Sequence, residues 1–250
     1  MRFDVVTLFP EFIEAAAGIG VVGRAATRGL IEIATWNPRD YTNDPGRRVD
    51  ARPFGGGPGM VMQAEPLQRT VAAAQSAADG KARVLCMTPQ GARLTQERVA
   101  QLAREPRLLV VCGRYEGIDE RWLATEVDEE LSIGDYVLSG GELAAAVLID
   151  AIGRLQSGAL GHADSAAQDS FAEGLLDHPH YARPEMVEEV GVPPVLMSGD
   201  HAAIARWRKQ QALGRTWLRR PELLARRSLD AEERSLLEEF RREFIAAQDR

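Results

Sequence analysis

Short apolar runs alternate with longer segments of helical pattern through the first two thirds of the chain. Helices are predicted to begin after Pro10, near Glu65, at Thr95 and near Gly141. The apolar runs between them are predicted to be strands at Phe3–Leu8, Leu30–Trp36, Arg83–Thr88, Leu108–Cys112 and Tyr136–Leu138. Strands that alternate with helices form a mostly parallel sheet covered on both faces. Residues 1–160 are therefore predicted to be an α/β domain.

The remainder of the chain has a different pattern. Residues 158–169 are small and polar, which is typical of a linker or mobile loop, and we place a flexible linker at 161–170. Asp200 is expected to cap a helix at His201–Leu213 that Gly214 stops. Asp230, with a glutamate three residues later, forms a capping box for a helix at Ala231–Gln248. Residues 171–250 are thus predicted to be a small helical domain.

Three of the apolar runs end in glycine-bearing turns. Arg83–Thr88 leads into a turn at 89–91, Leu108–Cys112 into one at 113–117, and Tyr136–Leu138 into Ser139-Gly-Gly141. Glycine allows a ligand to approach the backbone, and a following helix start offers free N–H groups. One site assembled from these three loops is expected.

A separate glycine-rich segment covers residues 52–60, with the sequence Arg-Pro-Phe-Gly-Gly-Gly-Pro-Gly-Met. It lacks the Lys-Ser/Thr pair of a nucleoside triphosphate-binding loop, and it lacks the spacing of a dinucleotide-binding turn. Both of those functions are therefore poorly supported. A structural turn and a loop that faces a substrate both remain open for this segment.

Composition narrows the class of protein. With 250 residues, 45% of them apolar, the chain is long enough for a sizeable core, and no run approaches a membrane-spanning helix. The first ten residues are typical of a strand and not of a signal peptide. The two cysteines, Cys86 and Cys112, each lie at the end of an apolar run, which favours a reduced, cytoplasmic protein. Because no run is long enough to span a membrane, no membrane partner is expected.

Net charge is −7, yet basic residues concentrate near the C-terminus. Between Arg206 and Arg227 the chain has eight basic residues and one acidic residue, Glu222. Such a patch is typical of phosphate binding, and a solvated helical face is the alternative. Trp207 and Trp217 lie within it, with core packing as the expectation and base stacking as the alternative.

Several polar residues could carry chemistry. Glu116, Asp119 and Glu120 follow a strand end, where ligand contact and salt bridges with nearby arginines are both open. The four histidines have no cysteine nearby, which argues against zinc. On its own, Asp169 before Ser-Phe-Ala-Glu is typical of a helix N-cap, and Arg154 of a cation at a helix C-terminus.

The longest motifs resemble those of the bacterial tRNA (guanine-N1)-methyltransferases. The resemblance runs in one order from Phe3 to about Leu224. Its motifs are Phe54–Met60, Cys112–Arg121, Ser132–Glu142, Asp169–Asp177 and Leu213–Glu222.

The resemblance implies a SPOUT-type, trefoil-knotted α/β domain followed by a small helical tRNA-binding domain. It implies a homodimer with active sites at the subunit interface. The implied reaction transfers a methyl group from S-adenosylmethionine to N1 of the guanosine immediately 3′ of the anticodon in tRNA. A knotted methyltransferase for another RNA and a non-catalytic RNA-binding protein are the alternatives. Neither the knot nor the dimer follows from the sequence pattern itself.

The resemblance also assigns roles to residues. Asp169 would be the general base for guanine N1, Arg154 would stabilise negative charge on O6, and Glu116 would be a carboxylate for an assisting Mg²⁺. Ala144 and Cys86 depart from residues that are common in the family. Cofactor binding is expected from Met87, Pro89, Gln90, Gly113, Glu116, Gly117, Ile133, Gly134, Asp135, Tyr136, Val137, Leu138, Gly140 and Gly141.

Overall fold

The computed structural model describes residues 1–161 and 165–248. It divides into two compact units, Met1–Ala163 and Asp164–Arg250, and each unit is described by itself. Residues 162–164, which fall in the predicted linker, lie outside the described residues.

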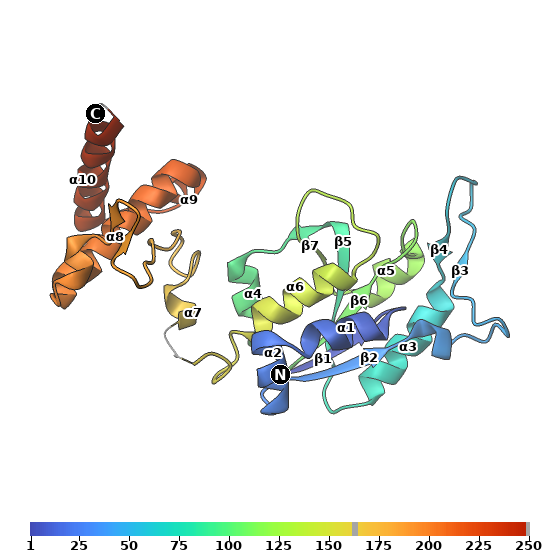
Figure 1. The fold of residues 1–250 in the computed structure, drawn as a ribbon. Coiled ribbons are helices and arrows are strands. Elements are labelled where there is room, and N and C mark those ends of the chain that lie inside the picture. Colours follow the sequence, from blue (N-terminus) through green and yellow to red (C-terminus); the bar gives the residue numbers. More distant parts are fainter. Residues whose placement is uncertain (162–164, 249–250) are drawn as a thin grey trace. The chain divides into compact units, whose positions relative to one another are not determined.

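The first unit is built on a five-stranded parallel sheet (Figure 1). Its strands are β1 (Arg2–Val6), β2 (Glu32–Trp36), β5 (Arg83–Arg93), β6 (Arg107–Cys112) and β7 (Glu129–Ser132), in the order β2-β1-β6-β5-β7. The helices of this unit are α1 (Pro10–Ala17), α2 (Gly20–Thr27), α3 (Ala64–Ser76), α4 (Gln96–Leu102), α5 (Glu120–Glu126) and α6 (Glu142–Gly153). The prediction of an α/β domain with a parallel sheet is confirmed.

Helices cover both faces of this sheet because alternate residues of each strand point to opposite sides. In β6, Leu108 and Val110 belong to the apolar cluster shared with α1, α2, α4 and α6. Leu109 and Val111 belong to the cluster shared with α3 and α5. All four side chains are fully buried. The unit is thus a three-layer sandwich whose strands are apolar on both faces, as expected for a buried parallel sheet.

One predicted strand is wrong. Tyr136–Leu138 is an exposed loop in which the Val137 side chain is 85% exposed, and the fifth strand is β7, a few residues earlier. The sequence obscured β7 because it begins Glu129-Glu130. A short strand at the edge of a sheet needs few buried apolar residues, and Leu131 is the buried apolar residue of β7. Glu129 forms ion pairs with Arg83 and Arg98.

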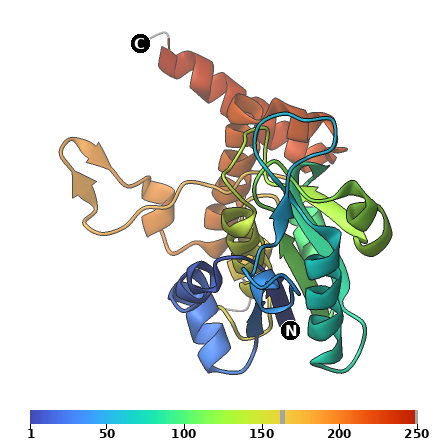
Figure 2. The ribbon, with the colours of Figure 1, turned by 90° about the vertical axis from the view of Figure 1, so that its right-hand side faces the viewer.

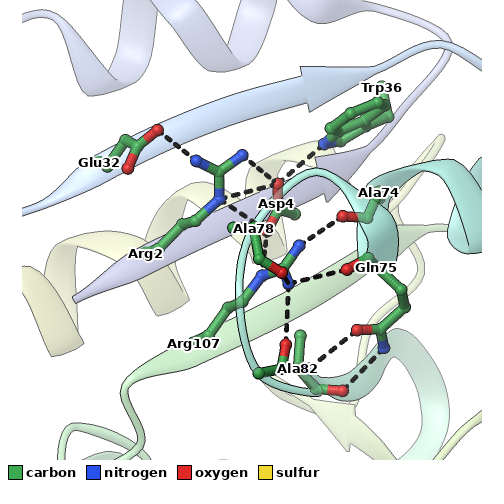
Figure 3. A network of polar contacts seen from close by, with 10 residues as sticks. Arg2, Asp4, Glu32, Trp36, Ala74, Gln75, Ala78, Ala82 and Arg107 are labelled. Carbon is green, nitrogen blue, oxygen red and sulfur yellow. Dashed lines mark hydrogen bonds and ion pairs between the residues drawn. The ribbon is translucent and has the colours of Figure 1, made fainter.

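A buried polar network lies toward the starts of β1 and β6 (Figure 3). The Asp4 carboxylate, fully buried in β1, accepts hydrogen bonds from Arg107 Nε at 2.8 Å, Trp36 Nε1 at 3.0 Å and the Arg2 guanidinium. Arg107 also donates to the carbonyl groups of Gln75, Ala78 and Gly80 at the end of α3. Arg107 therefore neutralises a buried charge and caps a helix C-terminus with one side chain.

A small antiparallel hairpin adjoins the sheet domain. Its strands are β3 (Asp50–Ala51) and β4 (Val61–Met62), and the glycine-rich segment 52–60 connects them. A 3₁₀ turn, η1 (Pro38–Asp40), precedes the hairpin.

The second unit is mainly helical. It contains α7 (Ser165–Gln168), the hairpin β8 (Met186–Val187) and β9 (Val190–Gly191), η2 (Pro194–Met197), α8 (His201–Arg219), α9 (Pro221–Ala225) and α10 (Ala231–Gln248). Figure 2 shows the hairpin projecting from the helices. Its core joins Leu175 with Leu213 of α8 and with Leu236 and Leu237 of α10.

Both predicted helix caps in this unit are confirmed. Asp200 accepts hydrogen bonds from the backbone N–H groups of Ala202 and Ala203, each at 3.0 Å. In the capping box, Glu233 N donates to Asp230 Oδ1 at 2.8 Å, and Asp230 N donates to a Glu233 carboxylate oxygen at 3.2 Å.

The predicted helix stop at Gly214 is wrong. Helix α8 continues through this residue to Arg219. Gly214 is buried beneath the Phe240 ring of α10, and a Cβ atom there would lie 2.3 Å from that ring. Glycine at this position allows close helix packing and does not end the helix.

Among residues 1–161 and 165–248, no helix is both long and apolar enough to cross a membrane.

Candidate active site

A cavity of about 350 Å³ opens where β5, β6 and β7 end. Three loops line it, as predicted: the turn inside β5, the loop after β6 and the loop between β7 and α6. Thirteen of the fourteen residues expected to bind the cofactor line this cavity. They are Met87, Pro89, Gln90, Gly113, Glu116, Gly117, Ile133, Gly134, Tyr136, Val137, Leu138, Gly140 and Gly141. Asp135 does not: its side chain is 94% exposed and lies 3.8 Å from an arginine nitrogen of Arg93.

The first loop is a break in the ladder of β5. Met87 pairs with Leu131 of β7, and the next paired residue is Ala92, which also faces Leu131, so residues 88–91 leave the sheet. Thr88 Oγ1 accepts a hydrogen bond from Gln90 N at 3.3 Å and shapes the turn. A Cβ atom at Gly91 would lie 2.4 Å from the backbone of β7, so only glycine fits there.

The second and third loops are joined through their backbones. Gly141 N donates to Gly113 O at 2.9 Å, and Arg114 forms an isolated bridge with Gly140. A Cβ atom at Gly141 would lie 2.8 Å from Cys112 Cα. The paired glycines before α6 therefore allow the third loop to pass directly over the end of β6.

The glycine-rich hairpin contacts the second loop. Glu116 N donates to Met60 O, and Met62 N donates to Gly117 O, both at 2.9 Å. Its tip, in contrast, is exposed, with Phe54 97% accessible. The foot of the segment is thus structural and braces one wall of the cavity, while the role of its tip remains a prediction.

The two cysteines are buried and unpaired. Burial, with Glu130 nearby, raises the pKa of the Cys86 thiol to about 12. Burial also raises the pKa of Cys112 well above its usual value. Both thiols are therefore neutral at physiological pH and are poor nucleophiles. Chemistry at this site has to come from other groups.

Three carboxylates, Glu116, Glu120 and Glu130, line the cavity. Asp119, in contrast, is held by Arg121 at 2.6 Å, and the hydrogen bond from that arginine lowers the pKa of Asp119. The salt-bridge interpretation is confirmed for Asp119.

Sequence reasoning missed a cluster of possible metal ligands in the second unit. The donor atoms of Asp177, His178 and His180 all lie within 4.8 Å of one another. His180 Nε2 lies 2.7 Å from Asp177 Oδ2. Burial alone raises the pKa of Asp177, but the contacts with His180 and His178 lower it below its usual value. Histidine–cysteine spacing was an unsuitable criterion here, because histidine and aspartate ligands suffice for many metals.

The two residues expected to act on guanine lie in different units. Arg154 is the C-cap residue of α6, where its backbone N–H donates to Asp150 O at 3.0 Å, so the helix C-terminus interpretation is confirmed. Asp169 follows α7 in a turn, and its backbone carbonyl accepts from Ala172 N at 3.2 Å. The N-cap interpretation of Asp169 is wrong, because no helix follows it directly.

The turn that contains Asp169 is anchored to α8. Asp177 N donates to Ser170 Oγ at 3.0 Å, which closes the turn on itself. Leu176 N donates to Thr216 Oγ1 at 2.9 Å, and Thr216 is fully buried. The conformation of the turn around Asp169 is therefore set by contacts with the helical core of its own unit.

The basic residues of segment 206–227 lie on two faces of α8 and on the residues that follow this helix. On the side toward α10, Arg206 pairs with Glu239 at 2.7 Å and Lys209 with Glu233 at 3.0 Å. Arg208, Arg215 and Arg219 follow one stripe of α8 by helical periodicity and have no acidic partner among the described residues. Among the described residues, this stripe and Arg226 beyond α8 are the cations of the segment without an ion pair.

The two tryptophans differ in their surroundings. Trp217 packs edge-on against Phe244 at 6.1 Å and beneath the Arg241 guanidinium at 4.8 Å, which confirms the packing interpretation for it. Trp207 has a tilted ring contact with Tyr181 at 6.4 Å.

The parallel sheet, the loop-lined cavity at its carboxyl edge and the basic stripe of α8 define an α/β enzyme of the class that binds a small cofactor and a nucleic acid. Residues 1–226 match the family described as "tRNA (Guanine-1)-methyltransferase TrmD", and the chain belongs to this family. Membership of this family confirms the prediction, made from the sequence, of an S-adenosylmethionine-dependent tRNA methyltransferase.

Relatives match over nearly the full length. A tRNA (guanine-N(1)-)-methyltransferase of Halorhodospira halophila is 66% identical over 239 residues, which cover 96% of this chain and 90% of that protein. A protein of the same description from Methylococcus capsulatus is 59% identical over 250 residues, covering all of both chains. One from Xanthomonas campestris is 59% identical over 252 residues, again covering all of both.

Proposed function

We propose that the chain transfers a methyl group from S-adenosylmethionine to N1 of the guanosine immediately 3′ of the anticodon in tRNA. The observation that carries the proposal is the cavity formed by three loops at the carboxyl edge of the sheet, in a chain that belongs to this family. The names of the relatives give tRNA and guanine N1 as their target.

The cavity fits the proposed cofactor by its size and its lining. Ile133, Leu138 and Ala144 offer apolar surface for a purine ring, and the glycines expose backbone groups to its polar edge. When bound, S-adenosylmethionine supplies an electrophilic methyl group on a sulfonium. The residues of the chain then have to hold the guanine, remove its proton and exclude water.

The proposed chemistry uses one carboxylate and one guanidinium. Guanine N1 carries a proton, which the Asp169 carboxylate accepts as the bond between N1 and the methyl carbon forms and the bond from sulfur to that carbon breaks. Negative charge that develops on O6 is stabilised by Arg154. The backbone that carries each group is held within its own unit, Arg154 at the end of α6 and Asp169 in the turn bound to α8.

Glu116 is the proposed carboxylate for Mg²⁺. It lies at the cavity beside Gly59 and is exposed, so an ion bound there keeps most of its water, as Mg²⁺ prefers. In the described part of the chain, the group of three converging ligand side chains is the histidine-containing cluster at Asp177 and not a set at the cavity. The chemistry above requires no step through the metal.

The trefoil knot is part of the proposal. It is supported by the way the chain leaves β7, crosses over the end of β6 at Gly141 and enters α6. The excursion of residues 88–91 out of β5 provides a second loop at the same place.

The homodimer is likewise proposed, and an apolar face supports it. Helices α1 and α6 lie side by side on one face of the first unit (Figure 1). Phe12, Leu143 and Val147 on these helices are between 40% and 51% exposed. This face begins at Gly141 and is therefore continuous with the cavity, as an interface containing active sites requires.

A substrate panel tests the proposed function. The purified protein is incubated with labelled S-adenosylmethionine, Mg²⁺ and unmodified tRNA that carries guanosine 3′ of the anticodon, beside an otherwise identical tRNA with adenosine there. We expect label only in the first, as 1-methylguanosine. Label at another position, or in ribosomal RNA instead, would contradict the proposed target.

A further inference from the structure

An ion pair at the wall of the cavity joins segments that follow three different strands: Arg114, which lines the cavity and is half-buried, pairs with the buried Glu142. Glu142, the first residue of α6, is 2% exposed, and its Oε2 lies 2.8 Å from Arg114 Nη2. Its other oxygen accepts a hydrogen bond from Thr7 Oγ1 at 2.8 Å. Thr7 follows β1, Arg114 follows β6 and Glu142 follows the loop after β7. The carboxylate therefore connects the carboxyl edge of the sheet across these elements.

The Arg114 guanidinium makes three further contacts. It lies over the Phe9 ring at 4.4 Å, and its Nη1 donates to Ser139 O at 3.1 Å. Its Nε is buried against Gly140, where a Cβ atom would lie 2.1 Å away, and has no hydrogen-bond partner among the described residues. The planar group is thus held between an aromatic ring and the third loop of the cavity.

We propose that Arg114 and Glu142 are positioning residues that hold the third loop, Ile133–Gly141, in the geometry that binds S-adenosylmethionine. The inference rests on the proposed assignment of this cavity to that cofactor. The loop has no secondary structure of its own, and Tyr136 and Val137 are exposed on it. The described contacts at its end, at Ser139 and Gly140, come from Arg114.

Charge distinguishes this role from direct ligand binding by Arg114. The guanidinium is already neutralised by a buried carboxylate, so it offers a ligand little net attraction. A buried charge that loses its partner is destabilised, and the loop it holds is expected to move. Removing Glu142 is therefore expected to disturb the cavity as much as removing Arg114, although Glu142 does not line it.

The experiment compares Glu142→Gln, Arg114→Gln, Arg114→Lys and the double variant Arg114→Gln/Glu142→Gln. The measurements are the Kd for S-adenosylmethionine, its KM, the KM for tRNA, kcat and the Tm. Each variant is expected to weaken cofactor binding by about ten- to a hundredfold, because small displacements of a positioning loop have effects of this size. The KM for tRNA is expected to stay within about twofold. Arg114→Lys should not restore cofactor affinity, because lysine has no planar group that can contact both Ser139 and Glu142.

The double variant keeps the test valid if a single variant folds poorly. It leaves no unpaired buried charge, so its Tm is expected to exceed that of either single variant, while cofactor binding stays as weak as in the singles. Arg69→Gln is the matched control, since it removes an exposed ion pair with Glu65 on α3, and it should bind the cofactor like the wild type.

Two outcomes would overturn the inference alone: normal cofactor affinity in Glu142→Gln or the double variant, or rescue by Arg114→Lys, which would indicate direct contact with a ligand. A wild-type protein that is folded but does not bind S-adenosylmethionine would overturn the cofactor assignment and the inference with it.

Discussion

Phe240 of α10 lies so close to the backbone of Gly214 in α8 that a methyl group at Gly214 would come within 2.3 Å of its ring. The ring has little freedom to retreat, because it is stacked on Phe244 at 6.2 Å. Glycine inside a helix costs about 1 kcal/mol relative to alanine. Its presence here indicates that close approach of the two helices contributes more than that.

Gly214→Ala is therefore expected to lower the free energy of unfolding by about 1–2 kcal/mol, because overpacking outweighs the gain in helix propensity. Gly153→Ala, in α6, is the matched control. A Cβ atom there would meet its nearest neighbours at 3.6 and 3.7 Å, which is ordinary contact, so stability should be unchanged or slightly higher. Chemical denaturation measures both, and a stabilised Gly214→Ala would contradict the packing described.

Asp4→Asn tests the buried network on the opposite part of the sheet. The variant leaves Arg107 buried without a counter-charge, so the free energy of unfolding should fall by about 3–5 kcal/mol. Glu65→Gln, which breaks an exposed pair on α3, is the control and should be nearly neutral. Equal effects of the two substitutions would show that burial does not determine how much the ion pair of Asp4 contributes to the free energy of unfolding.

The same network predicts a dependence of stability on pH. Burial alone raises the pKa of Asp4, but hydrogen bonds from Arg2, Arg107 and Trp36 outweigh it, so the pKa is lower in the folded protein than in the unfolded chain. A lowered pKa contributes stability above the unfolded value of about 4, and this is lost as pH falls through the folded value. Denaturation between pH 7 and pH 3 should therefore show a shallower acid loss in Asp4→Asn than in the wild type. Parallel curves would exclude a contribution from Asp4.

The buried strands and their terminal loops could be predicted from the sequence, whereas the edge strand β7 could not. Strands buried on both faces, such as Leu108–Cys112, are continuous apolar runs, and their glycine-bearing ends marked the cavity correctly. The edge strand β7 begins with two glutamates, and the first of them, Glu129, pairs with Arg83 and Arg98 of neighbouring elements. Such partners cannot be recognised from a local sequence pattern. The prediction that Gly214 ends a helix was wrong for the same reason, because the residue that packs against it, Phe240, is 26 residues away along the chain.

At the site, too, features set by the local sequence could be predicted, and features set by distant partners could not. Residue types at strand ends predicted which loops line the cavity, since backbone geometry there is local. The pairing of Arg114 with Glu142 could not be predicted, because it depends on how the third loop passes over β6. Roles for Asp169 and Arg154 came from resemblance alone, and the local interpretation of Asp169 as a helix cap was wrong.

The thiols are expected to be unreactive in the folded protein. With a pKa of about 12, only about one in ten thousand Cys86 thiols is ionised at pH 8, and Cys112 is buried more deeply. A thiol reagent at pH 8 should therefore modify neither cysteine in the native enzyme and both after unfolding in guanidinium chloride. Rapid modification of the native protein would show that the carboxyl edge of the sheet opens readily.

Asp169→Asn tests the proposed general base. The amide cannot accept the N1 proton, so the single-turnover rate of methyl transfer should fall by about 10²- to 10⁴-fold, while the Kd for S-adenosylmethionine stays the same. Glu173→Gln, on the exposed part of the same turn, is the control and should retain the rate. A normal rate in Asp169→Asn would assign the proton to another acceptor.

The stripe of α8 formed by Arg208, Arg215 and Arg219 is expected to bind the tRNA backbone. These three cations have no acidic partner among the described residues, whereas Arg206 on the other face is held by Glu239 at 2.7 Å. Each phosphate contact contributes about 0.7–0.9 to the slope of log K against log salt concentration. Replacing all three arginines by glutamine should therefore weaken tRNA binding and reduce this slope by about 2. Cofactor affinity should not change. Arg206→Gln, the paired control, should alter the slope little. A triple variant with the wild-type salt slope would contradict this surface, and a larger effect of Arg206→Gln would place the RNA on the face toward α10.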